Sequence, residues 1–299
     1  MSKVDLSVIL TAYNRKEYIK DAIKSLSAQT LDNSKFEVLC FTNFPDYDNI
    51  CSNTFKNVKI FHPKSSSWGE WIYLATLNAD GSILTFLDDD DMYEKYRLER
   101  ILNILRKYED QQCIFYINNS IIYKKEILNK NEKDYKVYSI NAYNLHEFRK
   151  LLRNKIYNNS RIAFSKKLFL DNLNLIRNID AALFDTLSFC LAYESKCKII
   201  IDESPLTIIR NTPNSLSKPS MNYLNRSLQI TDFILNYIAK SKELRAYLKY
   251  GKLYTNYLLH KLHKKECSKL DLNFNDLLYI LYIKDIKGLY LLIYNLLFC

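Results

Sequence analysis

The chain has 299 residues, 48% of them hydrophobic, which is ample for the core of a globular protein of one domain, or of one domain with an appendage. Forty-three Lys and Arg against 33 Asp and Glu give a net charge of +10, which favours anionic partners such as lipid headgroups or phosphorylated small molecules. The basic residues are spread along the chain and form no block, so a nucleic-acid-binding arm is excluded and no nucleic-acid partner is expected.

The seven cysteines are odd in number, scattered, and never spaced as C-x-x-C. This pattern predicts neither a disulfide framework nor a zinc site, and it favours a reducing, cytoplasmic location. The N-terminus passes from a charged residue straight into a short apolar strand, so no secretory signal peptide is predicted. His260 and His263 lie one helical turn apart without a nearby carboxylate pair, and we expect them to be surface residues.

Strands alternate with helices in the first part of the chain. The apolar run Leu6–Leu10 has strand length, it is broken from Thr11 onward, and apolar residues at helical spacing begin at Ile19. Further strands are predicted at 36–41, 58–61 and 83–87, and a helical stretch at 70–78. This alternation predicts a largely parallel sheet with helices on both faces, whose ligands gather beyond the carboxyl ends of the strands.

The middle of the chain continues the alternation, and the end of the chain does not. Apolar spacing predicts a helix over 98–105, strands at 113–117 and 121–123, a helix over 183–191 and a strand at 198–201. From about Ser220 only helical patterns remain. A segment of loop composition at 211–215 precedes this change, so we place a boundary near Pro219, between an α/β region of residues 1–218 and a helical C-terminal region of residues 219–299.

The run Phe86-Leu87-Asp88-Asp89-Asp90-Asp91 is the most informative stretch, because an apolar strand that ends in four mutually repelling carboxylates indicates a bound cation. If the extended conformation continues, Asp88 and Asp90 point to the same side and can share one hard divalent ion. The alternative is a solvated acidic turn whose last Asp caps a helix that begins near Met92, with Glu94 in its first turn.

Together with this run, the opening Val8-Ile9-Leu10-Thr11-Ala12-Tyr13-Asn14-Arg15 resembles the family 2 glycosyltransferases of the GT-A fold. The resemblance covers roughly residues 4–217. It implies a Rossmann-like, mostly parallel sheet, a first loop that holds the base and ribose of a nucleotide sugar, and an Asp-x-Asp element that contacts the sugar and a Mg²⁺ or Mn²⁺ ion bridging the diphosphate. Asp88 and Asp90 are the implied metal ligands.

An inverting transfer also needs one carboxylate that takes the proton of the acceptor hydroxyl. The family places this base in an acidic pair at the head of a helix, followed by a strand and a basic segment, and Asp185 fits its distance to the next strand and to Arg210. Asp180 competes for the same role. An ordinary helix N-terminal Asp is the structural alternative for Asp185.

Three positions depart from the family pattern. Thr42 and Asn43 stand where the family commonly has two Asp residues, which leaves the nucleotide base open. Trp71-Ile72-Tyr73 replaces a run that usually supplies a phosphate-side cation. Thr212 stands where many members have a His, so a third protein ligand to the metal is missing, and Arg210 is expected to compensate by pairing with diphosphate oxygens.

The predicted nucleotide-sugar site therefore combines residues from several strand ends. Tyr13 can stack on the base or pack against the first helix, and Trp68 and Trp71 can line the sugar site or belong to the core. The predicted donor-binding residues are Thr11, Ala12, Tyr13, Arg15, Thr42, Asn43, Asp88, Asp89 and Arg210.

The last segment, Leu277–Phe298, is rich in Leu, Ile and Tyr, but Lys284, Asp285 and Lys287 interrupt it and leave no apolar stretch of the ~20 residues that a membrane span needs. Two interpretations remain open. It is a helix packed in the core of the C-terminal region, or an amphipathic element that lies on a membrane with Tyr at the interface and Lys toward the headgroups.

The sequence thus predicts an inverting, metal-dependent glycosyltransferase of hexosyltransferase type that uses a nucleotide sugar, with UDP-sugar favoured, and a glycan or lipid-linked hydroxyl acceptor. It is expected in the cytoplasm, with possible peripheral association with the inner face of the membrane through its C-terminal helices. The rival hypotheses are a non-catalytic nucleotide-sugar-binding module and a membrane-surface scaffold of the same fold.

Overall fold

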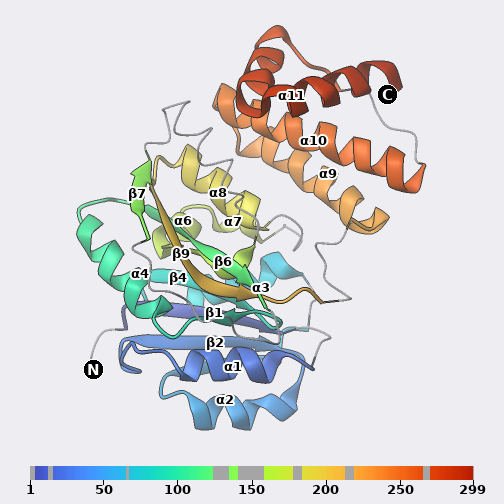
Figure 1. Cartoon of the computed structure of the whole chain (residues 1–299). Helices are drawn as coiled ribbons and strands as arrows, with labels where there is room; N and C mark the ends of the chain where they lie inside the picture. The colour runs from blue at the N-terminus through green and yellow to red at the C-terminus, as the bar shows by residue number, and fades with distance from the viewer. Residues whose placement is uncertain are drawn as a thin grey trace.

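A computed structural model describes residues 4–12, 16–64, 67–123, 135–140, 158–177, 184–212, 219–264 and 270–298. These residues form a nine-stranded mixed sheet covered by helices on both faces, with further helices at the C-terminal end (Figure 1). Tyr13, Arg15 and Asp180 lie outside the described residues, as do most of residues 211–217.

The strands run in the order β3-β2-β1-β4-β8-β6-β9-β5, and β7 pairs with β9. Strands β1 to β4 are mutually parallel, whereas β8 runs antiparallel between β4 and β6. The strand bounds are β1 Leu6–Ala12, β2 Phe36–Thr42, β3 Val58–Phe61, β4 Ile83–Asp88, β5 Met92–Tyr93, β6 Ile114–Ile122, β7 Val137–Ile140, β8 Ile162–Ser165 and β9 Lys198–Ile209.

Two sets of helices cover the sheet. One face packs against α1 (Ile19–Ser27), α2 (Asp48–Thr54) and α4 (Arg97–Leu105), and the other against α3 (Trp68–Asn78), α6 (Lys166–Leu170), α7 (Leu173–Ile176) and α8 (Phe184–Glu194). Short 3₁₀ turns η1 (Pro45–Tyr47), η2 (Arg106–Tyr108) and η3 (Asn159–Arg161) complete this region. Helices α9 (Met221–Tyr237), α10 (Lys242–His263) and α11 (Phe274–Phe298) gather beyond α8, far from α1 and α2 (Figure 1).

The central strand β1 shows why the predicted strands read as unbroken apolar runs. Ile9 packs into the core on the α3 side, whereas Val8 and Leu10 pack into the core on the α1 side. Because both faces are covered, both sets of alternating side chains must be apolar. The prediction of a two-face parallel sheet is confirmed for β1 to β4.

The register of these strands brings polar residues to one edge. Thr11 of β1 lies opposite Asp88 of β4, and Ala12 of β1 lies opposite Thr42 of β2. All these residues end their strands at the carboxyl edge of the sheet. The backbone pairing alone therefore places Thr11 and Ala12, the described residues of the predicted nucleotide-binding segment, at the same edge as the first acid of the acidic run.

At the opposite, amino edge, a buried polar cluster fixes the turn that leads into β4. Glu37 Oε1 accepts hydrogen bonds from Ser7 Oγ at 2.6 Å and from the Asp80 amide at 2.5 Å, and Ser7 Oγ also accepts one from the Gly81 amide at 2.9 Å. A Cβ atom at Gly81 would lie 2.7 Å from the backbone carbon of Leu6. Only glycine allows this close approach of the turn to β1.

The prediction that the cysteines form no disulfide is wrong, because Cys113 and Cys197 are bonded to each other. The two residues immediately precede β6 and β9, which pair in parallel from Ile114 and Lys198 onward. Parallel pairing brings the two strand beginnings together although 84 residues separate them in the sequence. Spacing along the chain does not reveal such a pair.

Three other element predictions differ from the structure. The two strands expected at 113–117 and 121–123 form the single strand β6, whose irregular register near Asn118 and Asn119 interrupts the apolar pattern. The strand expected at 198–201 continues through Pro205 to Ile209. No helix begins near Met92, where the short strand β5 pairs with β9, and α4 begins only at Arg97.

Helices α9 and α10 share a core with the sheet, whereas the buried residues of α11 pack in a separate cluster with α10. Ile234 of α9 and Tyr247 of α10 belong to the same buried cluster as Phe189 of α8 and Ile199 of β9. In the described part of the chain, no helix combines the length and apolar character required to cross a bilayer. The division near Pro219 stays a prediction.

Candidate active site

The acidic run forms a tight turn. Strand β4 ends at Asp88, and the Asp91 amide donates a hydrogen bond to the Asp88 carbonyl at 3.1 Å. The expectation that the extended conformation continues through Asp90 is therefore wrong, because a turn begins at Asp89. The alternative of a solvated turn is also wrong, since Asp89, Asp90 and Asp91 are at most 8% exposed.

Hydroxyl groups from distant parts of the chain meet this turn. Thr11 Oγ1 donates to Asp88 Oδ1 at 3.3 Å, and Thr212 Oγ1 donates to Asp90 Oδ2 at 3.2 Å. The Asp88 amide donates to Ser160 Oγ at 3.1 Å. Thr212, which departs from the family pattern, thus lies against a predicted metal ligand.

Asp91 stabilises the turn through hydrogen bonds to its carboxylate. Its two oxygens accept hydrogen bonds from Asn158 Nδ2 at 2.9 Å and from the Arg210 amide at 3.2 Å. Burial, reinforced by the charge of Asp90, raises the pKa of Asp91 to about 6. Asp91 therefore ties together β4, the chain before η3 and the end of β9.

Asp185, the predicted base, lies in the first turn of α8 and is 8% exposed. Its Oδ1 accepts a hydrogen bond from the Thr186 amide at 2.7 Å. Burial raises the pKa of Asp185 to about 6, and the Thr186 hydrogen bonds, the charge of Arg161 and the Asn158 amide oppose that rise. A carboxyl group with a pKa near neutrality suits a general base.

Asn158 links Asp185 to the acidic turn. Its side chain donates to Asp91, and its backbone amide donates to the Asp185 carboxylate. Ser160 and Arg161 extend this link. Ser160 Oγ accepts a hydrogen bond from the Asp88 amide, and the positive charge of Arg161 lowers the pKa of Asp185. Arg161 Nε is itself fixed by the Asn118 carbonyl at 2.8 Å.

These three residues were missed by sequence reasoning. Asn158, Ser160 and Arg161 precede the short strand β8, and their polar composition reads only as a loop. Their importance comes from the contacts of η3 with β4 and with α8, which no local pattern carries.

Arg210 lies at the site but its guanidinium is already engaged. Its Nη2 donates to Asp21 Oδ2 at 2.6 Å, and its guanidinium lies between the rings of Tyr18 and Tyr123, 4.8 and 4.5 Å from their centroids. Asp21 and the two rings thus orient the Arg210 side chain, and the hydrogen bond to Asp21 occupies only one of its nitrogens. Its Nε is buried and has no partner among the described residues.

On the nucleotide side, the ends of β1 and β2 come together. The Asn43 amide donates to the Ala12 carbonyl at 3.4 Å, and Thr42 Oγ1 accepts from the Phe44 amide at 3.0 Å. The ring nitrogen Nδ1 of His62 lies 2.9 Å from the Thr42 carbonyl oxygen, within hydrogen-bond distance. The neutral pair Thr42 and Asn43 therefore stands at the strand edge where the family commonly has acids.

The two tryptophans have different surroundings. Trp71 is 2% exposed and belongs to the core, so the core alternative holds for this residue. Trp68 is partly buried and its ring lies 5.9 Å from the ring of Phe184, the residue before Asp185. Its Nε1 is buried without a hydrogen-bond partner in the described part of the chain.

The residues at the turn fit a divalent cation. Among the described residues, no group of three or more His, Cys, Asp or Glu side chains is arranged to hold a metal by itself. A Mg²⁺ ion does not need such a cage, because it is commonly held by one or two carboxylates together with substrate phosphates. The carboxylates of Asp88 and Asp90, with the hydroxyls of Thr11 and Thr212 beside them, are oxygen ligands of the kind that such a cation prefers.

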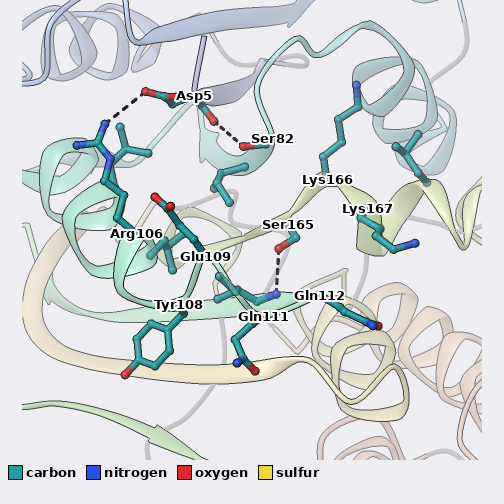
Figure 2. A pocket seen from close by; sticks show the side chains of 15 residues that line it. Asp5, Ser82, Arg106, Tyr108, Glu109, Gln111, Gln112, Ser165, Lys166 and Lys167 are labelled. Atoms are coloured by element: carbon teal, nitrogen blue, oxygen red, sulfur yellow. Dashed lines mark hydrogen bonds and ion pairs between the residues drawn. The ribbon is translucent and has the colours of Figure 1, made fainter. Parts of the chain in front are cut away.

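A cavity of about 480 Å³ lies at the other end of the sheet (Figure 2). Ser165, which ends β8, accepts a hydrogen bond there from the Ile114 amide at 2.9 Å, and Arg106 pairs with Asp5 at 3.6 Å. Strand β4 begins beside this cavity and reaches the acids five residues later, roughly 17 Å away at ~3.3 Å per residue. The cavity is therefore separate from the acidic turn.

Comparison with known proteins decides the family. The sequence profile described as Glycosyl transferase family 2 matches residues 7–175, more than half of the chain. The chain belongs to this family. The family and transferase predictions are thereby confirmed.

Relatives of this family 2 glycosyltransferase are similar over part of their length. An uncharacterized glycosyltransferase of Rickettsia felis is 26% identical over 142 residues, 47% of this chain and 24% of the relative. An uncharacterized glycosyltransferase of Haemophilus influenzae is 28% identical over 167 residues, 55% of this chain and 54% of the relative. The matched region thus spans from a quarter to about half of these relatives.

Solved structures share the fold. S. aureus TarS residues 1–349 in complex with UDP-GlcNAc has a TM-score of 0.62 at 15% identity, covering 94% of this chain and 80% of that one. The mannosyltransferase PcManGT from Pyrobaculum calidifontis, in complex with GDP-Man and Mn²⁺, has a TM-score of 0.57 at 12% identity, covering 97% and 79%. The prediction of a GT-A fold with a helical C-terminal region is confirmed.

Proposed function

We propose that the protein is an inverting glycosyltransferase that moves a sugar from a nucleoside diphosphate to a hydroxyl group of a glycan or lipid-linked acceptor. The observation that carries the proposal is the link Asp91–Asn158–Asp185, in which one residue hydrogen-bonds both the acidic turn and the buried acid of α8. A leaving-group site and a base are thereby held together by a short polar segment. UDP-sugar is the favoured donor, since the TarS neighbour was solved with UDP-GlcNAc.

The charges of the site residues suggest the role that each would have in binding the donor. Asp88 and Asp90 would hold Mg²⁺ or Mn²⁺, which when bound supplies Lewis-acid stabilisation of the departing diphosphate. The strand ends at Thr11, Ala12, Thr42 and Asn43 would hold the nucleoside, together with Tyr13, Arg15 and Asp89. Arg210 would add a cation to the diphosphate side.

Asp185 would take the proton of the acceptor hydroxyl. Its burial raises its pKa to about 6, so at neutral pH it is ionised and still basic enough to accept a proton. The amides of Thr186 and Asn158 fix the carboxylate in place. Trp68, which is partly buried and packs against Phe184, would offer an aromatic face to the sugar ring.

The test uses Asp90→Ala and Asp185→Ala in the full chain. Both variants are expected to lose transfer from a radiolabelled UDP-sugar by at least about 100-fold, because Asp185→Ala removes the proposed base and Asp90→Ala removes a proposed ligand of the metal. Only Asp90→Ala should weaken nucleotide binding in Mn²⁺. Asp171→Ala is the matched control, because Asp171 is an exposed acid that follows the last residue of α6. This variant should keep full activity. Unchanged turnover in both site variants would remove the mechanism.

A non-catalytic nucleotide-sugar-binding module is the second candidate, favoured by Thr212 in place of a third metal ligand. Slow hydrolysis of the donor in Mn²⁺ separates the two, because a competent site transfers some sugar to water. The donor itself can be found by thermal shift with a set of nucleotide sugars, since a bound ligand raises the apparent stability.

The acceptor and the cellular location belong to the same proposal. A lipid-linked acceptor would place the protein at the inner face of the membrane, with the C-terminal helices against the bilayer. Fractionation of cells that express the full chain, with and without a high-salt wash, tests this location.

A further inference from the structure

Helix α11 exposes an apolar face near its end. Its members are 46% to 70% exposed and follow the spacing i, i+1, i+4, i+7 and i+8, which places them on one side of a helix. We call this the outer face of α11, and it consists of Leu289, Tyr290, Ile293, Leu296 and Leu297.

The same helix is apolar on its packed side as well. Leu291 and Leu292 are at most 6% exposed and join Ala246 and Leu253 of α10 in a small core cluster. A helix that packs in water normally turns polar residues outward. The outer face therefore indicates a second apolar surface that covers it.

Tyrosines and lysines border this face. Tyr257 of α10 packs edge-on against Tyr290 and Tyr294 of α11, with ring centroids 5.9 and 4.9 Å apart. Lys261 donates to the Tyr257 hydroxyl at 2.8 Å, and Lys287 is exposed one helical turn before Tyr290. The order around the helix is thus leucine and isoleucine, then tyrosine, then lysine.

The charge of the region indicates what covers the face. Residues 219–299 contain 12 Lys and Arg against six Asp and Glu, and no acid follows Asp285. A second copy of this chain would bring like charges together, whereas an anionic surface would be attracted. Tyrosine at a polar and apolar boundary and lysine beside it are the composition of helices that lie in the plane of a bilayer.

We propose that the outer face of α11 lies on an anionic lipid bilayer, with its leucines and isoleucine in the acyl boundary and Lys261 and Lys287 at the headgroups. The C-terminal helices then act as a peripheral membrane anchor. This inference does not rest on the proposed sugar transfer, because binding to vesicles needs neither donor nor turnover.

The test is flotation of the full chain with vesicles of phosphatidylcholine alone and of phosphatidylcholine mixed with phosphatidylglycerol. We expect binding to the mixed vesicles only, and weaker binding at high salt. Ile293→Glu with Leu296→Glu should weaken it at least about tenfold, since both substitutions replace an apolar side chain of the outer face with a charge that cannot enter the acyl boundary. Lys261→Glu should weaken it about tenfold through charge reversal.

Leu77→Glu is the matched control, because Leu77 is 49% exposed on α3 and far from α11 in the sequence. It should bind vesicles as the wild type does. Ile293→Ser with Leu296→Ser repeats the test without added charge, and thermal unfolding confirms that each variant folds.

Two results would overturn the proposal. One is equal binding of wild type and the α11 variants to mixed vesicles. The other is a wild type that binds no vesicle and forms a dimer, by sedimentation equilibrium, that the α11 variants lose. Loss of sugar transfer with intact vesicle binding would contradict only the proposed function, so the two failures can be told apart.

Discussion

Asp185 combines burial with negative charge, and this combination is costly. The carboxyl group is 8% exposed and its pKa is raised from an ordinary 3.8 to about 6. The folded chain therefore binds a proton more tightly than the unfolded chain between these two values. Stability falls as the pH rises through this window, and above pH 6 the ionised group costs about 3 kcal/mol.

We predict that Asp185→Asn stabilises the protein at neutral pH. The amide keeps the size and the hydrogen bond from Thr186 but removes the buried charge, so the free energy of unfolding at pH 7.5 should rise by about 1 to 3 kcal/mol. At pH 3.5, below the ordinary pKa of 3.8, Asp185 is protonated in the folded state and mostly protonated in the unfolded state, so the two proteins should be nearly equal. Urea unfolding at both pH values measures the difference, and an equal gain at both would contradict the assignment of the charge.

Arg161, which lies in η3 and outside α8, affects the pKa of Asp185. Its guanidinium lowers the pKa of Asp185, and it is itself held by the Asn118 carbonyl. We predict that Arg161→Met moves the acidic limb of the pH–rate profile to higher pH, because the base then ionises later.

The measurement is kcat as a function of pH for wild type, Arg161→Met and Arg161→Lys. The lysine variant keeps a cation near Asp185 and should keep most of the wild-type profile. A merely structural role for Arg161 would lower kcat at all pH values without moving the limb.

At the level of the secondary-structure elements, the conformation of the turn before β4 depends on one residue, Gly81. The Gly81 amide reaches Ser7 and Glu37, and an added Cβ would lie 2.7 Å from the backbone of Leu6 and Ser7. We predict that Gly81→Ala lowers the free energy of unfolding by about 1 to 3 kcal/mol, the usual cost of overpacking.

The measurement is urea unfolding, with Gly251→Ala as control because a Cβ at Gly251 meets nothing within 4 Å. Gly251 lies inside α10, so its substitution should stabilise the protein by about 0.5 to 1 kcal/mol through helix propensity. Equal effects of the two substitutions would contradict the role given to the turn.

The elements that could be predicted from sequence are those with a complete local pattern. Strands β1 to β4 were predicted within two residues of their bounds, since apolar residues on both faces leave a continuous run. The short strands β5, β7 and β8 were not predicted. They have two to four residues, and pairing with β4, β6 or β9 decides their conformation.

The same distinction holds for the candidate site. Asp88 and Asp90 were selected from the run of four acids, and Asp185 and Arg210 through the family resemblance. The acidic turn and Asp185 are linked through Asn158. Asn158 and Arg161 carried no signal, because their role depends on where η3 meets β4 and α8. The turn at Asp89 was weighed only as a solvated alternative, because four identical residues have no internal periodicity that separates a turn from a strand.

For the whole molecule, the C-terminal helices α9 and α10 are part of the folded core. Ile230, Ile234 and Tyr247 are at most 8% exposed and pack in the same cluster as α8 and β9. We predict that deletion of residues 219–299 exposes this apolar surface and removes a large part of the ~5 to 15 kcal/mol by which a protein is usually stable.

Thermal unfolding and binding of a hydrophobic dye measure the effect. The shortened chain should unfold at a lower temperature or bind dye already in the cold, whereas the full chain with the α11 substitutions should do neither. A shortened chain as stable as the full one would show that residues 1–218 fold on their own.

The bond between Cys113 and Cys197 has a practical consequence. It joins the residues that immediately precede β6 and β9, and β9 ends immediately before Arg210. Preparations made with and without thiol reductant are therefore two covalent forms of one sequence, which differ in mass by two hydrogen atoms. Turnover or vesicle binding from different laboratories can be compared only after mass spectrometry has established which form was assayed.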